Sequence, residues 1–299
     1  FDFNVARNIT TLEKLNSEAE YFGGGAYDYF KIKVGGKTGI LYGYKYGGRL
    51  IRTNEELVAL KTVNPETGQQ QYYRDNNNYE RPGDLYIMDL DGDGQITADG
   101  DRTEIGNANP DFFGGFGTTL YWKGLMVNAT FTYSVGADRF YDEEKSSAGD
   151  INAYNVSKNV LKSWTMNPGV DRGYPRAMYY GWGSNSIITD RYVHDASFLR
   201  LSALNISYRL PKRLFGSSIV DAIDLTFQAT NLFTWTKYPG MDPQGNFSTS
   251  YSAFYNMGID YSSYPSARTY NVGIKITLKY LKLLFQRFNN LRYFLIMIE

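Results

Sequence analysis

The residues best suited to chemistry lie in one aspartate-rich stretch of the chain. Asp89, Asp91 and Asp93 stand at alternate positions, so their carboxylates can converge on one hard cation where an extended backbone passes into a turn. Gly94 follows at the sixth position, where an EF-hand loop makes its sharp turn. Carboxylate oxygens are the ligands that calcium prefers, so this spacing predicts a calcium site.

The match to an EF-hand loop is incomplete at its far end. The twelfth position, which holds a bidentate glutamate in an EF-hand, is Gly100. We expect Asp99 or Asp101 to complete the ligand shell, together with the carbonyl oxygen of Gln95. Asp-Gly repeats also form solvated turns that hold no metal, and the sequence leaves both interpretations open. A bound ion would be structural, because no pattern of a neighbouring base or nucleophile accompanies the loop.

Composition excludes several other kinds of site. The 299 residues include no Cys, which removes disulfides and thiolate ligands, and a single histidine, His194, which we expect in a loop. The net charge of zero gives no electrostatic basis for binding nucleic acid. Asp142, Glu143 and Glu144 could serve a glycosidase as paired carboxylates, but adjacent acids are more typical of a solvated run.

The elements that would position the aspartate loop are long antiparallel strands. Apolar and polar residues alternate with a period of two, and no apolar run reaches the roughly 18 residues of a membrane helix. The clearest hairpin turns at Lys123-Gly124 and places apolar residues opposite one another. We expect about seven strands, within residues 1–9, 29–46, 116–122, 125–135, 204–210, 223–230 and 270–280.

The two faces of this hairpin differ in a way that suits a membrane barrel. Leu125, Val127, Ala129, Phe131 and Tyr133 share the apolar face, which we expect to contact lipid. The side chains of the opposite face are too polar for the interior of a β-sandwich but suit a water-filled lumen. It comprises Gly117, Thr119, Asn128, Thr130, Thr132 and Ser134. The sequence therefore predicts an all-β fold, an antiparallel portion of a transmembrane β-barrel.

Connection lengths fall into two classes, as expected for a barrel with short periplasmic turns and long extracellular loops. The short connections are 123–124 and 211–221, and the long ones are 47–111, 137–197 and 234–268. The aspartate loop, 82–112, then lies on the extracellular side, and we expect 47–83 to be loop. The gap between residues 9 and 29 does not fit a short turn.

Several stretches resemble the C-terminal part of the SusC/RagA family of TonB-linked outer-membrane transporters. They are GDLYIMDLDGDGQITADGDRTEIGNANPDFFGGF, YWKGL, DASFLRLSALNISYRLP, NLFTWTKYPGMDPQ and YPSARTYNVGIKITL. The resemblance implies that residues 1–280 are part of a barrel of about 22 strands. Residues 281–299 are expected to be an atypical C-terminal extension, and the chain to be a fragment that transports nothing by itself.

The resemblance also implies a function and partners. The family imports glycans or peptides through the outer membrane of Gram-negative, Bacteroidetes-like bacteria, and its members are not enzymes. A SusD-like surface lipoprotein covers the barrel, and the TonB–ExbB–ExbD system acts through an N-terminal region that this chain lacks. Outer-membrane lipid would surround the wall.

Aromatic residues of the long loops are the candidates for ligand contacts. Aromatic side chains in or beside the long loops could stack on a ligand, and Trp235 could equally belong to an aromatic girdle at the membrane interface. The candidates are Tyr179, Tyr180, Trp182, Trp235 and Tyr238.

The alternative to a transporter is a secreted, calcium-stabilised, carbohydrate-binding β-protein, which would need two sheets packed face to face.

Overall fold

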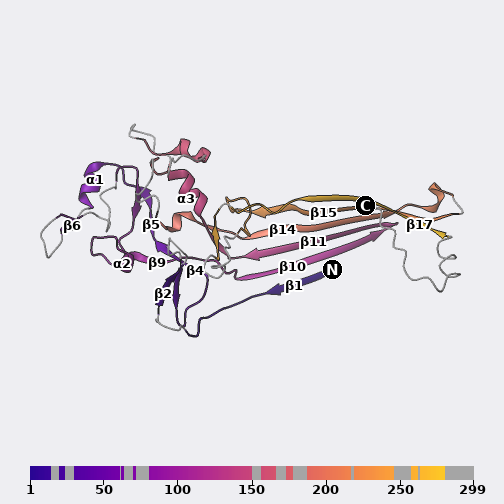
Figure 1. The fold of residues 1–299 in the computed structure, drawn as a ribbon, viewed down its shortest axis with the longest axis horizontal. Coiled ribbons are helices and arrows are strands. Elements are labelled where there is room, and N and C mark those ends of the chain that lie inside the picture. Colours follow the sequence, from indigo (N-terminus) through magenta and orange to yellow (C-terminus); the bar gives the residue numbers. More distant parts are fainter. Residues whose placement is uncertain are drawn as a thin grey trace, which may run out of the picture.

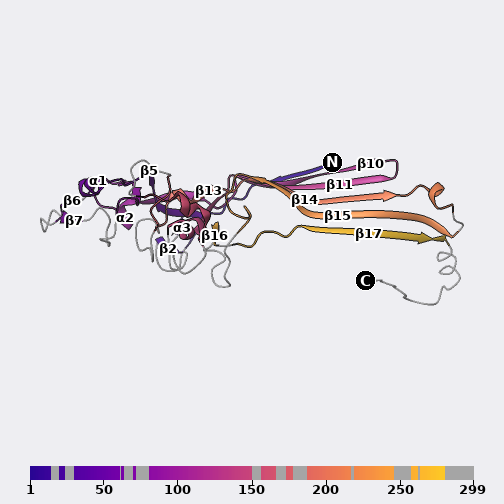
Figure 2. The ribbon, with the colours of Figure 1, turned by 90° about the horizontal axis from the view of Figure 1, so that it is seen from above.

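The computed structural model describes residues 1–14, 20–23, 30–60, 62–63, 70–71, 81–149, 156–165, 173–177, 187–216, 219–245, 257–261 and 263–279. It has two regions, which Figures 1 and 2 show end to end. One is a curved, single-layered sheet of six strands, here called the wall. The other, here called the head, is the described part of residues 7–111, 136–197 and 237–268. No described helix has the length and apolar character needed to cross a membrane.

The wall strands are all antiparallel to their neighbours and occur in the order β1-β10-β11-β14-β15-β17. Most have the roughly 9 to 11 residues that a tilted strand needs to cross a bilayer, or slightly more. Their bounds are β1 (Asp2–Ala6), β10 (Phe112–Trp122), β11 (Leu125–Val135), β14 (Phe198–Arg209), β15 (Val220–Thr236) and β17 (Thr269–Leu278).

The turn between β10 and β11 has the predicted two residues. Lys123 and Gly124 both have positive φ, 46° and 88°, as a type I′ turn requires, and Trp122 lies opposite Leu125. A Cβ at Gly124 would lie 2.9 Å from the carbonyl oxygen of Arg209 on β14. The predicted hairpin register is therefore confirmed.

All long connections leave the wall at one end. Residues 7–111, 136–197 and 237–268 join the strands at the head end, and residues 123–124 and 210–219 join them at the other end. In Figure 1 the head lies to the left and the short turns to the right of the wall. The predicted sorting of long and short connections is confirmed.

One predicted wall strand was wrong. The described part of the predicted strand 29–46 lies in the head, where β3 (Phe30–Lys33) and β4 (Ile40–Tyr44) belong to a separate sheet, β2-β3-β4-β9. Strand β1 instead pairs directly with β10, so residues 7–111 form a single connection and the gap after Ile9 needs no turn. Side chains that are buried and side chains that are less buried do alternate in residues 40–44. Leu41, however, is buried in the head core and does not face lipid.

The polar segment 47–83 was predicted to be loop, but it contains a helix. Helix α1 (Asn54–Ala59) begins at Thr53, whose Oγ1 accepts a hydrogen bond of 3.1 Å from the backbone N–H of Glu56. The Glu56 carboxylate accepts one of 2.7 Å from the N–H of Arg52. Thr53-x-x-Glu56 has the spacing of a capping box, so the sequence did contain a signal for this helix.

The remaining head elements are short. They are β2 (Glu20–Gly23), β5 (Tyr46–Leu50), β6 (Thr62–Val63), β7 (Gln70–Gln71), β8 (Leu85–Ile87), α2 (Ala98–Asp101), β9 (Arg102–Asn107), β12 (Asp138–Tyr141), α3 (Asp142–Gly149), η2 (Lys158–Lys162), η4 (Asp190–Tyr192), β13 (Val193–Asp195) and β16 (Ile259–Asp260). A further 3₁₀ turn, η5 (Lys212–Leu214), lies at the other end of the wall.

The buried hydrophobic cluster of the described chain lies in the head. It draws on all three long connections, and none of its described members belongs to a wall strand. The cluster comprises Phe30, Leu41, Leu50, Leu85, Ile87, Ile96, Ile105, Phe140, Ile188, Tyr192 and Ile259. The head is thus one folded unit built from three connections.

Candidate functional site

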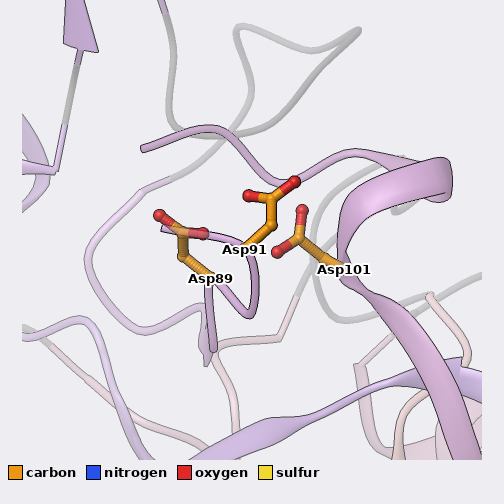
Figure 3. Close-up of side chains that lie close together, drawn as sticks. All are labelled: Asp89, Asp91 and Asp101. Carbon is orange, nitrogen blue, oxygen red and sulfur yellow. The ribbon is translucent and has the colours of Figure 1, made fainter. Parts of the chain in front are cut away.

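The aspartate loop brings three carboxylates together. Oxygens of Asp89, Asp91 and Asp101 lie within 4.8 Å of one another, with Asp89 and Asp91 on the loop and Asp101 at the end of α2 (Figure 3). Asp91 is exposed and Asp101 is fully buried. The group therefore opens to solvent on one side and is anchored on the other.

Backbone hydrogen bonds fix the carboxylates that face one another. The two oxygens of Asp89 accept the N–H groups of Gly92 and Gly94, at 2.7 and 2.8 Å. The two oxygens of Asp101 accept those of Leu90 and Thr97, both at 2.7 Å. Asp101 thereby joins the first turn of the loop to its last, and buried Ile96 between them ties the loop to the head core.

Gly100 explains why the loop departs from the EF-hand pattern. A Cβ at Gly100 would lie 2.1 Å from Oδ2 of Asp91, so any larger residue would exclude that carboxylate. The position that carries a glutamate in an EF-hand here makes room, and the next residue, Asp101, supplies the carboxylate. Three convergent carboxylates beside this space fit a hard divalent cation.

Two other predicted ligands, Asp93 and Asp99, lie outside this group. Asp93 turns back on the loop, where its Oδ1 accepts the N–H of Gln95 at 2.7 Å. Asp93 and Asp99 are exposed, and neither belongs to the three-carboxylate cluster. Of the two candidates for closing the shell, the geometry favours Asp101 over Asp99.

The wall presents two faces of opposite chemistry. On the polar face, strand register places side chains from five strands in one row: Thr119, Asn128, Asn205, Gln228 and Asn271. Within that row, Asn128 donates to Thr119 at 2.9 Å and Asn205 donates to Asn128 at 3.3 Å. The adjacent row on the apolar face comprises Leu120, Val127, Ile206, Phe227 and Val272.

Neither face is covered by a second sheet among the described residues. Apolar side chains such as Leu120 and Val272 are 62% and 82% exposed, which no sandwich core would allow. The expected assignment of Asn128 and Val127 to opposite faces is confirmed. The sandwich that the competing carbohydrate-binding interpretation needs is absent from the described wall.

Aromatic rings mark both ends of the apolar face. Phe233 and Trp235 lie at the head end of β15, with ring centroids 6.0 Å apart and more than half of each side chain exposed. Trp122 lies beside the short turn at the other end, with Lys123 Nζ 5.2 Å from its ring centroid. For Trp235, this placement favours the girdle over a ligand contact.

The other aromatic candidates are placed differently. Tyr238 is buried in the head, where its hydroxyl donates to Asp260 at 2.7 Å and its ring lies 5.8 Å from that of Tyr141. Burial first, and then the hydrogen bond to Asp260, raises the pKa of this phenol. Tyr238 therefore holds head segments together. Tyr179, Tyr180 and Trp182 lie outside the described residues.

Sequence reasoning missed a buried ion pair that joins wall and head. Arg200, on the polar face of β14, donates from Nη2 to Asp242 at 2.6 Å and from Nη1 to Gln244 at 2.7 Å, and its side chain is only 6% exposed. Asp242 also accepts the N–H and hydroxyl of Ser266, at 3.1 and 2.5 Å. We call this group the Arg200 clamp. Its signal was an arginine on the polar face of β14 near the head end of the wall.

The clamp holds Asp242 ionised. Burial by itself would raise the pKa of this carboxyl, but hydrogen bonds from Ser266, the Gln244 amide and Arg200 outweigh burial and lower it. Because a buried charge without a partner is costly, the clamp requires both of its ions. It fixes the 237–268 connection against the polar face of the wall.

The acidic run 142–144 is not the solvated run that we had expected. Asp142 is buried at the start of α3 and pairs with Lys145 at 2.7 Å. Glu144 lies 2.7 Å from Nε2 of His194, which stands in β13 rather than in a loop. The acids begin a helix that packs within the head, so they make structural contacts there.

Comparison with known proteins gives a consistent result. TonB-dependent receptor P3 of Formosa agariphila is 30% identical over 284 residues, covering 92% of this chain and 26% of that receptor. TonB-dependent receptor P39 of the same organism is 28% identical over 297 residues, covering 92% of this chain and 28% of that receptor. TonB-dependent receptor SusC of Bacteroides thetaiotaomicron is 24% identical over 209 residues, covering 69% of this chain and 18% of SusC. No family model matches the chain.

Solved structures give the same fold. A structure of the RagAB peptide transporter aligns with a TM-score of 0.59 at 23% identity, covering 92% of this chain and 26% of that one. The RagAB peptide importer in its open-open state aligns with a TM-score of 0.53, covering 89% and 25%. The predicted all-β, antiparallel barrel portion is confirmed. The chain spans about a quarter of the length of its first two curated relatives.

Proposed function

This chain is homologous to a segment of TonB-dependent receptors of the SusC/RagA type, and we propose that it forms part of the barrel wall and of the outer surface of an outer-membrane importer. In this proposal the apolar face of the wall contacts lipid and the polar face lines the lumen. The head projects from the outer surface, where a SusD-like lipoprotein would meet it. The cargo would be a glycan or a peptide, carried with energy supplied through TonB.

One observation carries this proposal: the wall is a single layer with an apolar face, a polar face and no second layer on either among the described residues. Such a sheet buries no core of its own in water. It is stable only where lipid takes one face and a lumen takes the other. The placement of every long connection at one end supports an outer and an inner side.

The orientation can be tested in the full-length receptor after any cysteine outside this segment is replaced, because the 299 residues contain none. We expect a cysteine at Lys158, in the head, to react with a membrane-impermeant maleimide on intact cells. A cysteine at Lys123, in the short turn, should react only after the outer membrane is permeabilised. Labelling of both sites on intact cells, or of neither, contradicts the proposed orientation.

Import and its partner need separate tests. Deleting the receptor gene should abolish uptake of one labelled oligomer, and supplying labelled oligosaccharides and peptides side by side identifies its class. A SusD-like lipoprotein should copurify with the full-length receptor. Unchanged uptake of every oligomer after deletion argues against an importer.

We also propose that the aspartate loop holds a structural calcium ion. Asp89, Asp91 and Asp101 would bind it, and the space beside Gly100 supports the fit. The ion would offset the mutual repulsion of three carboxylates and hold the first and last turns of the loop together.

Calcium binding should be measured by titration calorimetry on the full-length receptor after chelation. Asp91→Asn, at an exposed position, should weaken binding by about tenfold or more, since each charged ligand contributes to affinity. Asp99→Asn is the matched control and should bind as the wild type does. Equal binding by both variants, or no binding by the wild type, contradicts the site.

A further inference from the structure

A cleft of about 830 Å³ lies on the sheet β2-β3-β4-β9 in the head. The alternation of β3 and β4 separates it from the core: Phe30 and Leu41 are buried in the core, whereas their neighbours Lys31, Ile40 and Tyr42 line the cleft. Strands β9 and β12 complete the lining. This volume lies within the range of about 300 to 1,000 Å³ that small-molecule sites occupy.

The cleft is rich in lysine. Lys31 and Lys33 come from β3, and Lys37 comes from the connection to β4. Lys45 also lines the cleft, and its ammonium lies 3.1 Å from a carboxylate oxygen of Asp190. The lining carries four lysines and two acids, Glu104 and Asp138, so it has a local excess of positive charge in a chain whose positive and negative residues balance at 31 each. A concave surface with an excess of one charge concentrates ligands of the opposite charge.

An aromatic ring and acceptor groups accompany these lysines. The Tyr42 ring lies 5.2 Å from Lys31 Nζ and 5.4 Å from Arg102 Cζ, measured to the ring centroid. Glu104 stands opposite Tyr42 in the strand register and is exposed. Asp138 lines the cleft too, and its carboxylate accepts the N–H of Asn107 at 2.9 Å. The cleft thus combines cations for an acidic group with acceptors for hydroxyl or N–H donors.

We propose that this cleft binds an oligomer that carries carboxylate or sulfate groups, with Lys33 and Lys37 pairing with the acidic group and Lys31 and Tyr42 contacting the rest of the ligand. An acidic saccharide and an acidic peptide both have this chemistry. The inference rests on the proposed import function in that the ligand is cargo captured at the outer surface. In this proposal the cleft selects acidic over neutral cargo.

The test is direct binding to the full-length receptor, measured by calorimetry at low and high salt. The probes are a galacturonic acid trisaccharide, the neutral galactose trisaccharide of the same size, and a tripeptide of glutamate. The variant Lys33→Gln/Lys37→Gln changes two exposed side chains, so folding should be unaffected. The matched control is Lys158→Gln/Lys162→Gln, in η2 of the head and outside the cleft lining.

We expect the wild type and the control to bind one acidic probe at least about tenfold more tightly than the neutral one, and the cleft variant to bind it about three- to tenfold more weakly. Raising the salt concentration should weaken this binding, because the charges are exposed. The acidic probe that binds identifies the source of the ligand. Equal binding of acidic and neutral probes, or equal binding by variant and control, overturns the inference. Uptake measured in parallel separates the cleft proposal from the import proposal. Binding of an acidic probe without its uptake contradicts import but leaves the cleft proposal standing.

Discussion

Buried side chains distinguish the head from the wall. In the head, Phe140, Leu85 and Ile87 are fully buried, whereas in the wall Leu120, Val272 and Ile274 expose more than half of their surface. The same alternation of apolar and polar residues produced both regions. In the head the apolar sides of different strands pack against one another in a core, whereas in the wall apolar side chains contact only neighbours within the same sheet, such as Phe116 and Phe131, and no second layer covers them among the described residues.

This difference shows where each region obtains its stability. The head removes its own apolar surface from water, as any water-soluble domain does. The wall gains backbone hydrogen bonds and cross-strand contacts, but its outer face requires an apolar medium that the chain does not provide. The Arg200 clamp links the two regions, so the head also restrains the wall.

The largest effect should come from opening the head core. Phe140→Ala removes a fully buried ring that lies 6.1 Å, centroid to centroid, from Tyr192, and should lower the free energy of unfolding of the head by about 3 to 5 kcal/mol. Limited proteolysis of the full-length receptor should then cleave the head while the barrel stays folded. Phe233→Ala, on the exposed face of the wall, is the matched control. Resistance of the Phe140→Ala head to protease would show that the core is not what stabilises it.

The next effect should separate the two faces of the wall. Ala129→Arg on the apolar face should lower the stability of the full-length receptor in liposomes by about 2 to 4 kcal/mol, because the charge would enter lipid near mid-strand. Thr130→Arg, on the polar face, should cost far less. Urea titration of both variants measures the difference. Equal costs for neighbouring positions would mean that the wall does not separate lipid from lumen.

A smaller effect should appear at the short turn. Gly124→Ala forces a Cβ onto a φ of 88° and against the carbonyl of Arg209, and should cost about 1 kcal/mol or slightly more. Gly48→Ala, in the head, places the same residue at a φ of 75° with no atom within 4 Å of its Cβ. The excess cost at Gly124, read from urea titrations, isolates the contact with β14. No excess would mean that β10–β11 and β14 adjust freely at this end.

The smallest effect should be that of mild acid on the Arg200 clamp. Because the folded-state pKa of Asp242 is lowered, its contribution is complete above the ordinary aspartate pKa of about 3.9 and is lost only as pH falls through the lower folded value. Amide exchange at Gln244 and Ser266, both of which donate to Asp242, should show constant protection between about pH 7 and 5 after correction for intrinsic rates. Asp242→Asn should lower that protection. A loss of protection near pH 5 in the wild type would refute the clamp as described.

The wall was predictable because one rule governs it. Strand alternation, the two-residue turn at Lys123-Gly124 and the polar row around Asn128 follow from residue type and spacing alone. The head was less predictable, because the same alternation also occurs in strands that do not belong to the wall. Its strand β4 alternates as a wall strand does, and only the partner segments, far away in the sequence, decide that Leu41 enters a core.

The candidate metal cluster was predictable in part. The spacing of Asp89 and Asp91 identified the loop, but choosing Asp101 over Asp99 depends on the space at Gly100, which a sequence pattern does not contain. The Arg200 clamp joins residues from three separate motifs, DASFLRLSALNISYRLP, NLFTWTKYPGMDPQ and YPSARTYNVGIKITL. Each motif was visible, but their pairing required the folded chain.

The uneven lengths of the connections have a consequence for the kinetics of folding. Strands β10 and β11 need close only a two-residue turn, whereas β1 reaches β10 across residues 7–111. The entropy of closing a flexible chain grows with the logarithm of its length, so the β1–β10 pair carries an extra cost of roughly 3 kcal/mol if the connection is unfolded. A folded head removes most of that cost, since its core already gathers residues from all three long connections and so brings the strand ends together. We therefore expect hairpin β10–β11 to acquire amide protection early in refolding of the full-length receptor, and β1 to acquire it only after the head has folded.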